Sequence, residues 1–180
     1  GIRSELRQGR QVYVVYPLIQ ENERMDLLDL ERGYEELTHA LPIYKIGKLH
    51  GKMKSTDKEK IMQQFANGQV NVLVATTVIE VGVNVPNASV MVIQHADRFG
   101  LAQLHQLRGR VGRGADKSYC ILLTNYELSE QTRRRMQIMV DTTDGFIIAE
   151  EDLKSRGPGD LEGTVQSGLP IKLRVANLTH

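Results

Sequence analysis

Two arginines stand three residues apart in a glycine-rich segment of this chain. Arg110 and Arg113 belong to the run Gln103-Leu-His-Gln-Leu-Arg-Gly-Arg-Val-Gly-Arg113. A guanidinium group is planar, permanently charged and able to contact two phosphate oxygens at once, whereas a lysine ammonium acts as a point charge. The pair is therefore suited to binding a polyphosphate. The alternative is a solvated basic helix end, because cations near a helix C-terminus also favour the helix dipole.

Helical periodicity divides the same segment into a packing face and a charged face. At 100° per residue, Leu104, Leu107 and Val111 fall on one stripe, while Gln106 falls with the two arginines on a different face. Three glycines lie between and after the arginines, and each costs about 1 kcal/mol relative to alanine inside a helix. Their repetition indicates a need for close backbone approach.

A second group of polar residues follows a predicted strand, in the turn Leu49-His-Gly-Lys-Met53. We expect the next helix to open just after this turn. Free amides at a helix N-terminus, beside a glycine and a lysine, favour phosphate binding. The candidate phosphate contacts of this turn are His50, Gly51 and Lys52.

A third candidate lies in the segment Ala75 to Pro86, where Thr76 and Thr77 follow another predicted strand. These hydroxyls are placed either to cap a helix or to contact a backbone phosphate. Ligands of parallel sheets gather at the carboxyl ends of the strands. Two candidate turns at one such edge favour phosphate contact for both.

The first two thirds of the chain alternate short apolar runs with helical patterns, which predicts an α/β fold with a parallel sheet covered by helices on both faces. The predicted strands are Val12–Tyr16, Ile43–His50, Val72–Ala75, Val90–Ile93 and Tyr119–Leu123. The predicted helices are Leu27–Ala40 and Thr56–Asn67. The second has capping-box spacing from Thr56 to Glu59 and a stop at Asn67-Gly68.

Composition excludes several classes of protein. The 180 residues suit one domain with a smaller appendage, and the formal charge of +1 gives no global basic field, so any nucleic-acid contact must come from local patches. The single Cys120 fits a buried small hydrophobe and a reducing cytoplasm. We expect a soluble cytoplasmic monomer without a membrane span, a secretion signal or a metal site of its own.

The sequence lacks the motifs that a chain needs in order to bind a nucleotide without another domain. There is no Gly-x-x-x-x-Gly-Lys-Ser/Thr loop and no Asp-Glu pair after an apolar strand to hold Mg²⁺, so the chain cannot by itself build a P-loop ATP site. No Gly-x-Gly-x-x-Gly follows a strand, which argues against a dinucleotide enzyme. The remaining alternatives are a domain that contacts a nucleotide held by another domain and a non-catalytic nucleic-acid-binding module.

These motifs together resemble those of superfamily 2 helicases. Gln106-Leu-Arg-Gly-Arg-Val-Gly-Arg113 is similar to the sixth motif, Ala75 to Pro86 to the fifth, and Val12 to Glu21 with Leu49 to Met53 to the fourth and its neighbour. Over nearly all 180 residues the chain resembles the RecG family of bacterial DNA helicases. The resemblance implies a second RecA-like motor domain whose partner domain lies upstream in the same polypeptide.

The last third of the chain extends the resemblance. Helical patterns around Glu130 to Asp141 and over Asp144 to Leu153 precede the glycine-rich run Arg156-Gly-Pro-Gly-Asp-Leu-Glu-Gly163. This arrangement is similar to the translocation motif that the RecG family shares with transcription-repair coupling factors, which remain the alternative relative. We therefore expect a RecA-like domain over 1–124 and a helical hairpin with its loop over 125–180.

The resemblance also implies roles for individual residues. Arg110 and Arg113 are expected to act as catalytic arginine fingers on ATP, whose Mg²⁺ and phosphates are held mainly by the upstream domain. The expected substrate is branched or duplex DNA, such as stalled forks and Holliday junctions. The ATP-binding set is Gln106, Gly82, Asn84, Arg110 and Arg113, the DNA-binding set is His50, Gly51, Lys52, Thr76 and Thr77, and the coupling set is Arg135, Arg156 and Gln166. Asn84 stands where the family usually has aspartate, so it can hydrogen-bond but brings no charge.

Overall fold

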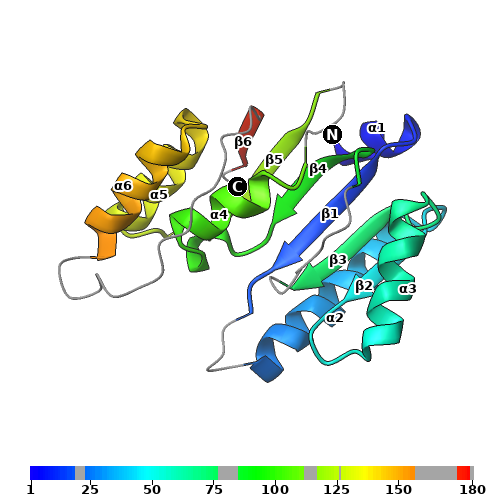
Figure 1. Ribbon diagram of the computed structural model, residues 1–180. Coiled ribbons are helices and arrows are strands. Elements are labelled where there is room, and N and C mark those ends of the chain that lie inside the picture. Colours follow the sequence, from blue (N-terminus) through cyan, green and yellow to red (C-terminus); the bar gives the residue numbers. More distant parts are fainter. Residues whose placement is uncertain (19–22, 77–84, 112–116, 126, 157–173, 179–180) are drawn as a thin grey trace.

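The fold is given by a computed structural model that describes residues 1–18, 23–76, 85–111, 117–125, 127–156 and 174–178 (Figure 1). The helices are α1 (Ile2–Arg7), α2 (Glu23–Ala40), α3 (Ser55–Ala66), the 3-10 turn η2 (Ala96–Arg98), α4 (Leu101–Arg108), α5 (Glu130–Asp141) and α6 (Gly145–Arg156). The strands are β1 (Gln11–Tyr16), β2 (Ile46–Leu49), β3 (Val72–Thr76), β4 (Ala88–Ile93), β5 (Tyr119–Leu123) and β6 (Arg174–Leu178).

The strands form one sheet in the order β2-β3-β1-β4-β5-β6, and every neighbouring pair is parallel. Parallel neighbours require a crossover connection, which α2, α3 and α4 provide between the strands that they separate. The predicted parallel sheet is therefore confirmed. Its strand order places β1 and β3 in the interior, where both faces need apolar side chains.

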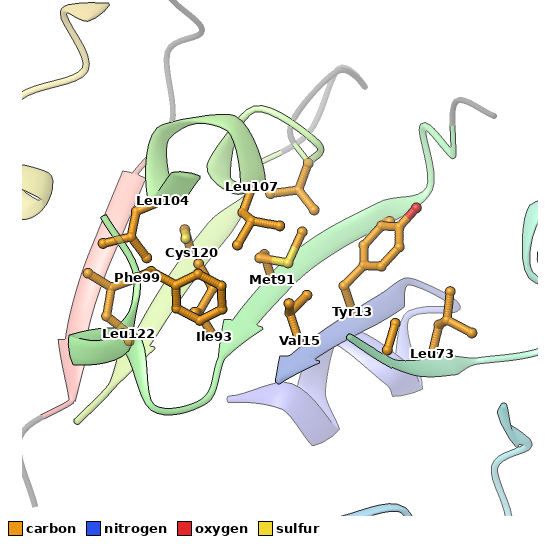
Figure 2. Close-up of a cluster of buried hydrophobic side chains, with 14 of the residues drawn as sticks. Tyr13, Val15, Leu73, Met91, Ile93, Phe99, Leu104, Leu107, Cys120 and Leu122 are labelled. Carbon is orange, nitrogen blue, oxygen red and sulfur yellow. The ribbon is translucent and has the colours of Figure 1, made fainter. Parts of the chain in front are cut away.

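Two apolar cores cover the two faces of the sheet. Alternate residues of each strand point to opposite faces, so Tyr13 and Val15 belong to one core while Val12 and Val14 belong to the other. The first core receives α3, α4 and α5, and Figure 2 shows Leu104 and Leu107 of α4 packed over the strands. The second core receives α1 and α2. Helices on both faces are thus also confirmed.

The C-terminal helices pack on α4, and α5 also contacts strand β6 at the edge of the sheet. Figure 1 places α5 and α6 side by side next to α4, and both helices contact it. Met136 and Met139 of α5 and Ile148 of α6 are buried in the first core. These helices therefore extend that core outward as a second layer.

Several predicted elements have different bounds in the structure: α2 begins at Glu23 and not at Leu27, and β4 begins at Ala88 and not at Val90. Two further shifts have a clear physical reason. The second strand begins at Ile46 and not at Ile43, because Pro42 opens a turn in which the Tyr44 amide donates to the Leu41 carbonyl at 3.1 Å. Helix α3 begins at Ser55 after the extended Lys54, without a side-chain cap, so the predicted Thr56 capping box is wrong. Thr56 is already the second residue of this helix and cannot occupy the cap position.

The predicted stop of α3 at Asn67-Gly68 is confirmed. Asn67 is the C-cap, and Gly68 has φ of 80°, a left-handed conformation that glycine adopts without a steric penalty. The Gly68 amide donates to the Phe65 carbonyl at 3.1 Å. The next residues then lead directly into β3.

Strand β6 was not predicted from the sequence. It pairs with β5 through register partners such as Tyr119 and Arg174, which are far apart along the chain. The segment 125–180 thus contributes a strand to the sheet as well as the two predicted helices. Among the described residues, no helix combines the length and apolarity needed to cross a membrane.

Candidate functional site

The arginine turn, defined here as Gly109, Arg110 and Val111, directly follows α4. The helix ends at Arg108, and the Arg110 amide donates to the Leu107 carbonyl at 3.0 Å. The helical pattern predicted from the sequence runs through Arg110. This prediction is wrong, because α4 ends two residues earlier, at Arg108, and Gly109 is its C-cap. Val111 is buried and Arg110 is exposed, so the predicted separation of packing and charged faces persists through the turn.

The arginine turn lies next to the first core, because the charge of Arg110 affects the pKa of a tyrosine in that core. Burial raises the pKa of Tyr13 to about 12, while the positive charge of Arg110 acts in the opposite direction. Arg110 therefore lies within electrostatic range of Tyr13, near the start of β1. Gln106 is exposed one helical turn before Arg110. Arg113, the second predicted finger, lies outside the described residues.

The carboxyl-edge set, defined here as His50, Gly51, Lys52 and Thr76, lies at the ends of two neighbouring strands. Leu49 of β2 is the register partner of Ala75 of β3, so His50 and Thr76 are each one residue further along adjacent strands. Gly51 and Lys52 are exposed, and Thr76 is buried. The structure therefore brings the turn after β2 and the end of β3 to one edge of the sheet. Thr77, Gly82 and Asn84 lie outside the described residues.

Three lysines and Glu31 lie within electrostatic range of His50, and one of the lysines, Lys48, is ion-paired with Glu31 at 3.0 Å. Burial lowers the pKa of His50, and the charges of Lys48, Lys58 and Lys52 lower it further, against an opposing effect of Glu31. Its Nδ1 atom is buried without a hydrogen-bond partner among the described residues. A neutral imidazole can donate its N–H to an anion, and the positive charges beside it attract that anion. Lys48 and Lys58 were missed in the sequence, although the recurrence of lysines from 45 to 60 is a signal that could have found them.

The arginine turn and the carboxyl-edge set lie at different ends of the sheet. Helix α4 begins after the carboxyl end of β4 and returns the chain toward the amino end of β5, which is parallel to β4. Its last residues therefore lie toward the amino ends of the strands. The chain thus has two separate basic surfaces that could contact phosphate.

Arg135 connects α5 to the segment between β4 and α4. Its guanidinium donates to the Asp97 carbonyl at 2.9 Å and to the Phe99 carbonyl at 3.3 Å. Arg156 ends α6, and Gln166 lies outside the described residues. The predicted coupling of Arg135 with those two residues therefore stays a prediction.

Arg108 is a buried cation that the sequence analysis did not single out. It is 1% exposed, and its guanidinium donates to the carbonyls of Met139 and Thr142 at 2.8 Å each. Burial lowers the pKa of this guanidinium, which nevertheless stays protonated in proteins. Periodicity could have found it, because Leu101, Leu104 and Arg108 have the i, i+3, i+7 spacing of one helix face.

Two further predictions concern side chains with no part in these surfaces. Cys120 is fully buried in the first core, and burial raises the pKa of its thiol to about 12, which confirms the small apolar role. Among the residues that the structure describes, no three His, Cys, Asp or Glu side chains gather as a metal site would require.

Comparison with known families identifies two matching segments. Residues 2–115 match the family described as helicase conserved C-terminal domain. Residues 142–180 match the family described as ATP-dependent DNA helicase RecG, domain 3, C-terminal.

Individual relatives extend these matches along the chain. The ATP-dependent DNA helicase RecG of Synechocystis sp. is 54% identical over 94% of this chain and 20% of its own length. That of Streptococcus pneumoniae is 53% identical over 98% of this chain and 26% of its own length. The chain therefore spans about a fifth of the length of the first relative and about a quarter of the length of the second.

Solved structures give the same result for the fold. A structure of RecG bound to a three-way DNA junction matches with a TM-score of 0.74 and 45% identity, over 89% of this chain and 21% of that one. Dbp5 of Saccharomyces cerevisiae, bound to RNA and ADP BeF3, matches with a TM-score of 0.52 and 16% identity, over 98% of this chain and 37% of that one. The second likeness concerns the fold alone.

Proposed function

This chain belongs to the helicase conserved C-terminal domain family, and on that premise we propose that it is the second motor domain of a DNA translocase that unwinds and regresses branched DNA. Its fold is RecA-like and its sequence is similar to RecG, as the motifs predicted. The proposal extends these findings to an activity that needs the rest of the polypeptide.

One observation carries the proposal. The helicase C-terminal match over residues 2–115 is followed in the same chain by the RecG-specific match over residues 142–180. The first segment contains both basic surfaces, and the second contains all of α6 together with β6. A general nucleic-acid-binding module has no need for this second segment, whereas a RecG-type motor does.

ATP would lie in a cleft between this domain and the upstream one. Arg110 and Arg113 would reach its γ-phosphate and stabilise the charge of the transition state, as arginine fingers do with an effect of about 10³–10⁵ on rate. Gln106 would contact the same nucleotide from the exposed side of α4, and Gly82 and Asn84 would complete the contacts. The exposed position of Arg110 after α4 supports this role.

Magnesium belongs with the upstream domain in this proposal. The described residues hold no cluster of three acidic or other ligating side chains that would fit the ion. The contribution of the present residues to hydrolysis is the positive charge of the arginines.

DNA would contact the carboxyl-edge set, with Thr77 beside it. Lys52 and Lys58 supply positive charge, whereas the charge of Lys48 is balanced by Glu31 and the Thr76 side chain is buried at 2% exposure. Such contacts bind the phosphate backbone and give affinity that depends on salt without reading the base sequence. Closure of the cleft would then move α5 and α6 against the duplex, with Arg135, Arg156 and Gln166 linking the moving parts.

Arg110→Ala in the full-length protein tests the proposal. DNA-stimulated ATP hydrolysis should fall by about 10³–10⁵, because the transition-state charge loses its partner. Affinity for forked DNA should stay close to that of the wild type, since Arg110 lies away from the carboxyl-edge set. Steady-state ATPase assays and equilibrium DNA binding at fixed salt give the two measurements.

Arg133→Ala is the matched control, because Arg133 is an exposed arginine of α5. It should leave hydrolysis unchanged. A normal hydrolysis rate in Arg110→Ala would show that the finger assignment is wrong. Loss of DNA affinity with hydrolysis retained would instead support a binding module.

A further inference from the structure

Strands β1 and β4 are neighbours, and the helices that follow them lie on opposite faces of the sheet. Helix α2 follows β1 and packs on the second core, whereas α4 follows β4 and packs on the first. Such a pair of strands forms a topological switch point, and ligands of open parallel sheets bind there, outside the carboxyl ends of the strands. No described residue that is assigned above to DNA or ATP lies at this position.

His95 lies at the carboxyl end of this pair of strands. Ile93, the last residue of β4, is the register partner of Val15 in β1. The Gln94 amide continues the pairing, because it donates to the Val15 carbonyl at 2.8 Å. His95 is the next residue, and its side chain is partly exposed. An imidazole is therefore available at the switch point.

The backbone of His95 has a conformation that few histidines adopt. Its φ of 50° and ψ of 48° lie in the left-handed region, and no other non-glycine residue in the described segments has a positive φ. Glycine would adopt this conformation without a steric penalty, yet the sequence places a large polar side chain here. Residues held in such conformations concentrate at functional sites. The strained backbone thus indicates that the imidazole has a use.

An ion pair beside His95 accounts for the nearest positive charge. Arg98 of η2 lies 3.6 Å from the carboxylate of Asp26, near the start of α2. The Asp26 side chain is 3% exposed, so its negative charge faces Arg98 and not the solvent. Arg98 is therefore balanced by this carboxylate. The His95 ring, in contrast, makes no hydrogen bond within the described part of the chain and can donate to a ligand.

The class of ligand follows from the distance between His95 and the carboxyl-edge set. Three strand spacings separate the ends of β2 and β4, which is about 14 Å at about 4.8 Å per spacing. One DNA strand carries a phosphate about every 3.4 Å along the helix axis. A duplex lying along this edge would therefore present phosphates to His50 and to His95, roughly four phosphates apart.

We propose that His95 is a further DNA contact, which donates a hydrogen bond to a backbone phosphate at the switch point between β1 and β4. The inference rests on the proposed function, since it assumes that DNA lies along the carboxyl edge of the sheet. It extends that contact from the end of β2 across the sheet to the end of β4. A phosphate contact of this kind positions the duplex without reading its base sequence.

His95→Gly in the full-length protein tests the inference, because glycine removes the imidazole and relieves the backbone. The dissociation constant for forked DNA at fixed salt should rise roughly tenfold, as for the loss of one hydrogen bond. The thermal midpoint should stay at or above that of wild type, since the strain is gone. Lower affinity in an equally stable protein cannot be explained by unfolding.

His95→Ala and His95→Asn separate the side chain from the backbone. Alanine should lose the same affinity as glycine and also lower the thermal midpoint, because it keeps the strain. Asparagine tolerates the left-handed conformation and has an N–H donor, so it should recover part of the affinity. Loss of affinity in His95→Ala with full affinity in His95→Gly would overturn the inference, because only the backbone would then matter. If His95→Gly does not fold, His95→Asn and His95→Ala carry the test, and wild-type affinity in His95→Ala overturns the inference.

His39→Ala is the matched control. His39 is exposed near the end of α2, which runs from the carboxyl end of β1 toward the amino end of β2. It therefore lies away from the carboxyl edge and should keep the wild-type affinity. An equal loss in His39→Ala and His95→Gly would overturn the inference.

Lys52→Ala separates the inference from the proposed function. Lower affinity in Lys52→Ala with wild-type affinity in His95→Gly overturns the inference alone. Wild-type affinity in both overturns DNA binding at the carboxyl edge, and the inference with it. If both contacts exist, their losses should add in the double variant, because sites more than about 10 Å apart act independently. A higher KM for ATP in His95→Gly with unchanged DNA affinity would assign His95 to the nucleotide and overturn the inference.

Discussion

Arg108 and Arg110 are two residues apart, yet one is buried against α5 and the other is exposed. Their residue type alone does not separate these roles. The sequence singled out Arg110 from its spacing to Arg113. Helical periodicity could have placed Arg108 on the buried face, but only the structure shows the carbonyls on α5 to which it donates. Those partners are backbone atoms, which leave no trace in the amino-acid types.

His105 gives a prediction about pH. Burial, and then the charge of Arg108, lowers the pKa of His105. Because its folded pKa lies below the unfolded value, the stability that it contributes is complete above about pH 6.5 and is lost as the pH falls through the folded pKa. The thermal midpoint of wild type should therefore drop between about pH 7.5 and about pH 5.5, and His105→Gln should reduce this drop.

The reduction should be partial, since burial also lowers the pKa of His50 and contributes in the same direction. His39→Gln serves as the control, because His39 is exposed near the end of α2. It should keep the pH-dependent drop of wild type. Identical drops in wild type and His105→Gln would show that the lowered pKa of His105 does not contribute to this pH dependence.

At the scale of elements, α2 approaches β1 so closely that one position has no room for a side chain. A Cβ atom at Gly33 would overlap Oη and the ring of Tyr16, the last residue of β1. Tyr16 is itself buried in the second core. Neither the apolar pattern of α2 nor that of β1 predicts this contact, because it depends on how the helix crosses the strand.

Gly33→Ala should therefore destabilise the fold. Alanine favours a helix by about 1 kcal/mol over glycine, but overpacking a core typically costs about 1–3 kcal/mol. Since several atoms of one buried ring are affected, we expect the upper part of that range and a net decrease in the free energy of unfolding. Chemical denaturation of the two proteins gives the measurement.

Gly51→Ala is the control for this comparison. A Cβ atom at Gly51 would meet no heavy atom within 4 Å. The free energy of unfolding should change by less than about 0.5 kcal/mol. A Gly33→Ala protein as stable as wild type would show that Tyr16 moves aside without cost.

At the scale of the whole molecule, the parallel sheet gives the domain two different ends. All strands point the same way, so the turns after β2 and β3 meet at one edge while the arginine turn lies toward the other (Figure 1). A single domain can therefore present phosphate contacts to DNA and to a nucleotide at separate places. This separation is what the proposed motor requires.

Lys52 and Lys45 test this polarity in the full-length protein. They flank β2, with Lys45 before its amino end and Lys52 after its carboxyl end, and both are exposed. If Lys52 contacts one DNA phosphate, Lys52→Ala should lower the slope of log affinity against log salt by about 0.9. Lys45→Ala should leave the slope unchanged. Equal effects of both substitutions would contradict binding at the carboxyl edge.

The amino-acid sequence by itself determined the class of fold, most of the strands and the family motifs. These features depend on local periodicity and on residues close together in the chain, as in β1, β5 and the run from Gln103 to Arg113. Helix α5 was predicted for the same reason, from the pattern of Glu130–Asp141.

Only the tertiary structure decided which distant residues meet. Strand β6 pairs with β5 across more than fifty residues, and Arg108 caps a helix that begins more than twenty residues later. Both contacts depend on hydrogen bonds to backbone atoms, which every residue type provides. The sequence therefore determined which surfaces carry charge, whereas the packing of α4 against α5 decided how the arginine turn is connected to the rest of the domain.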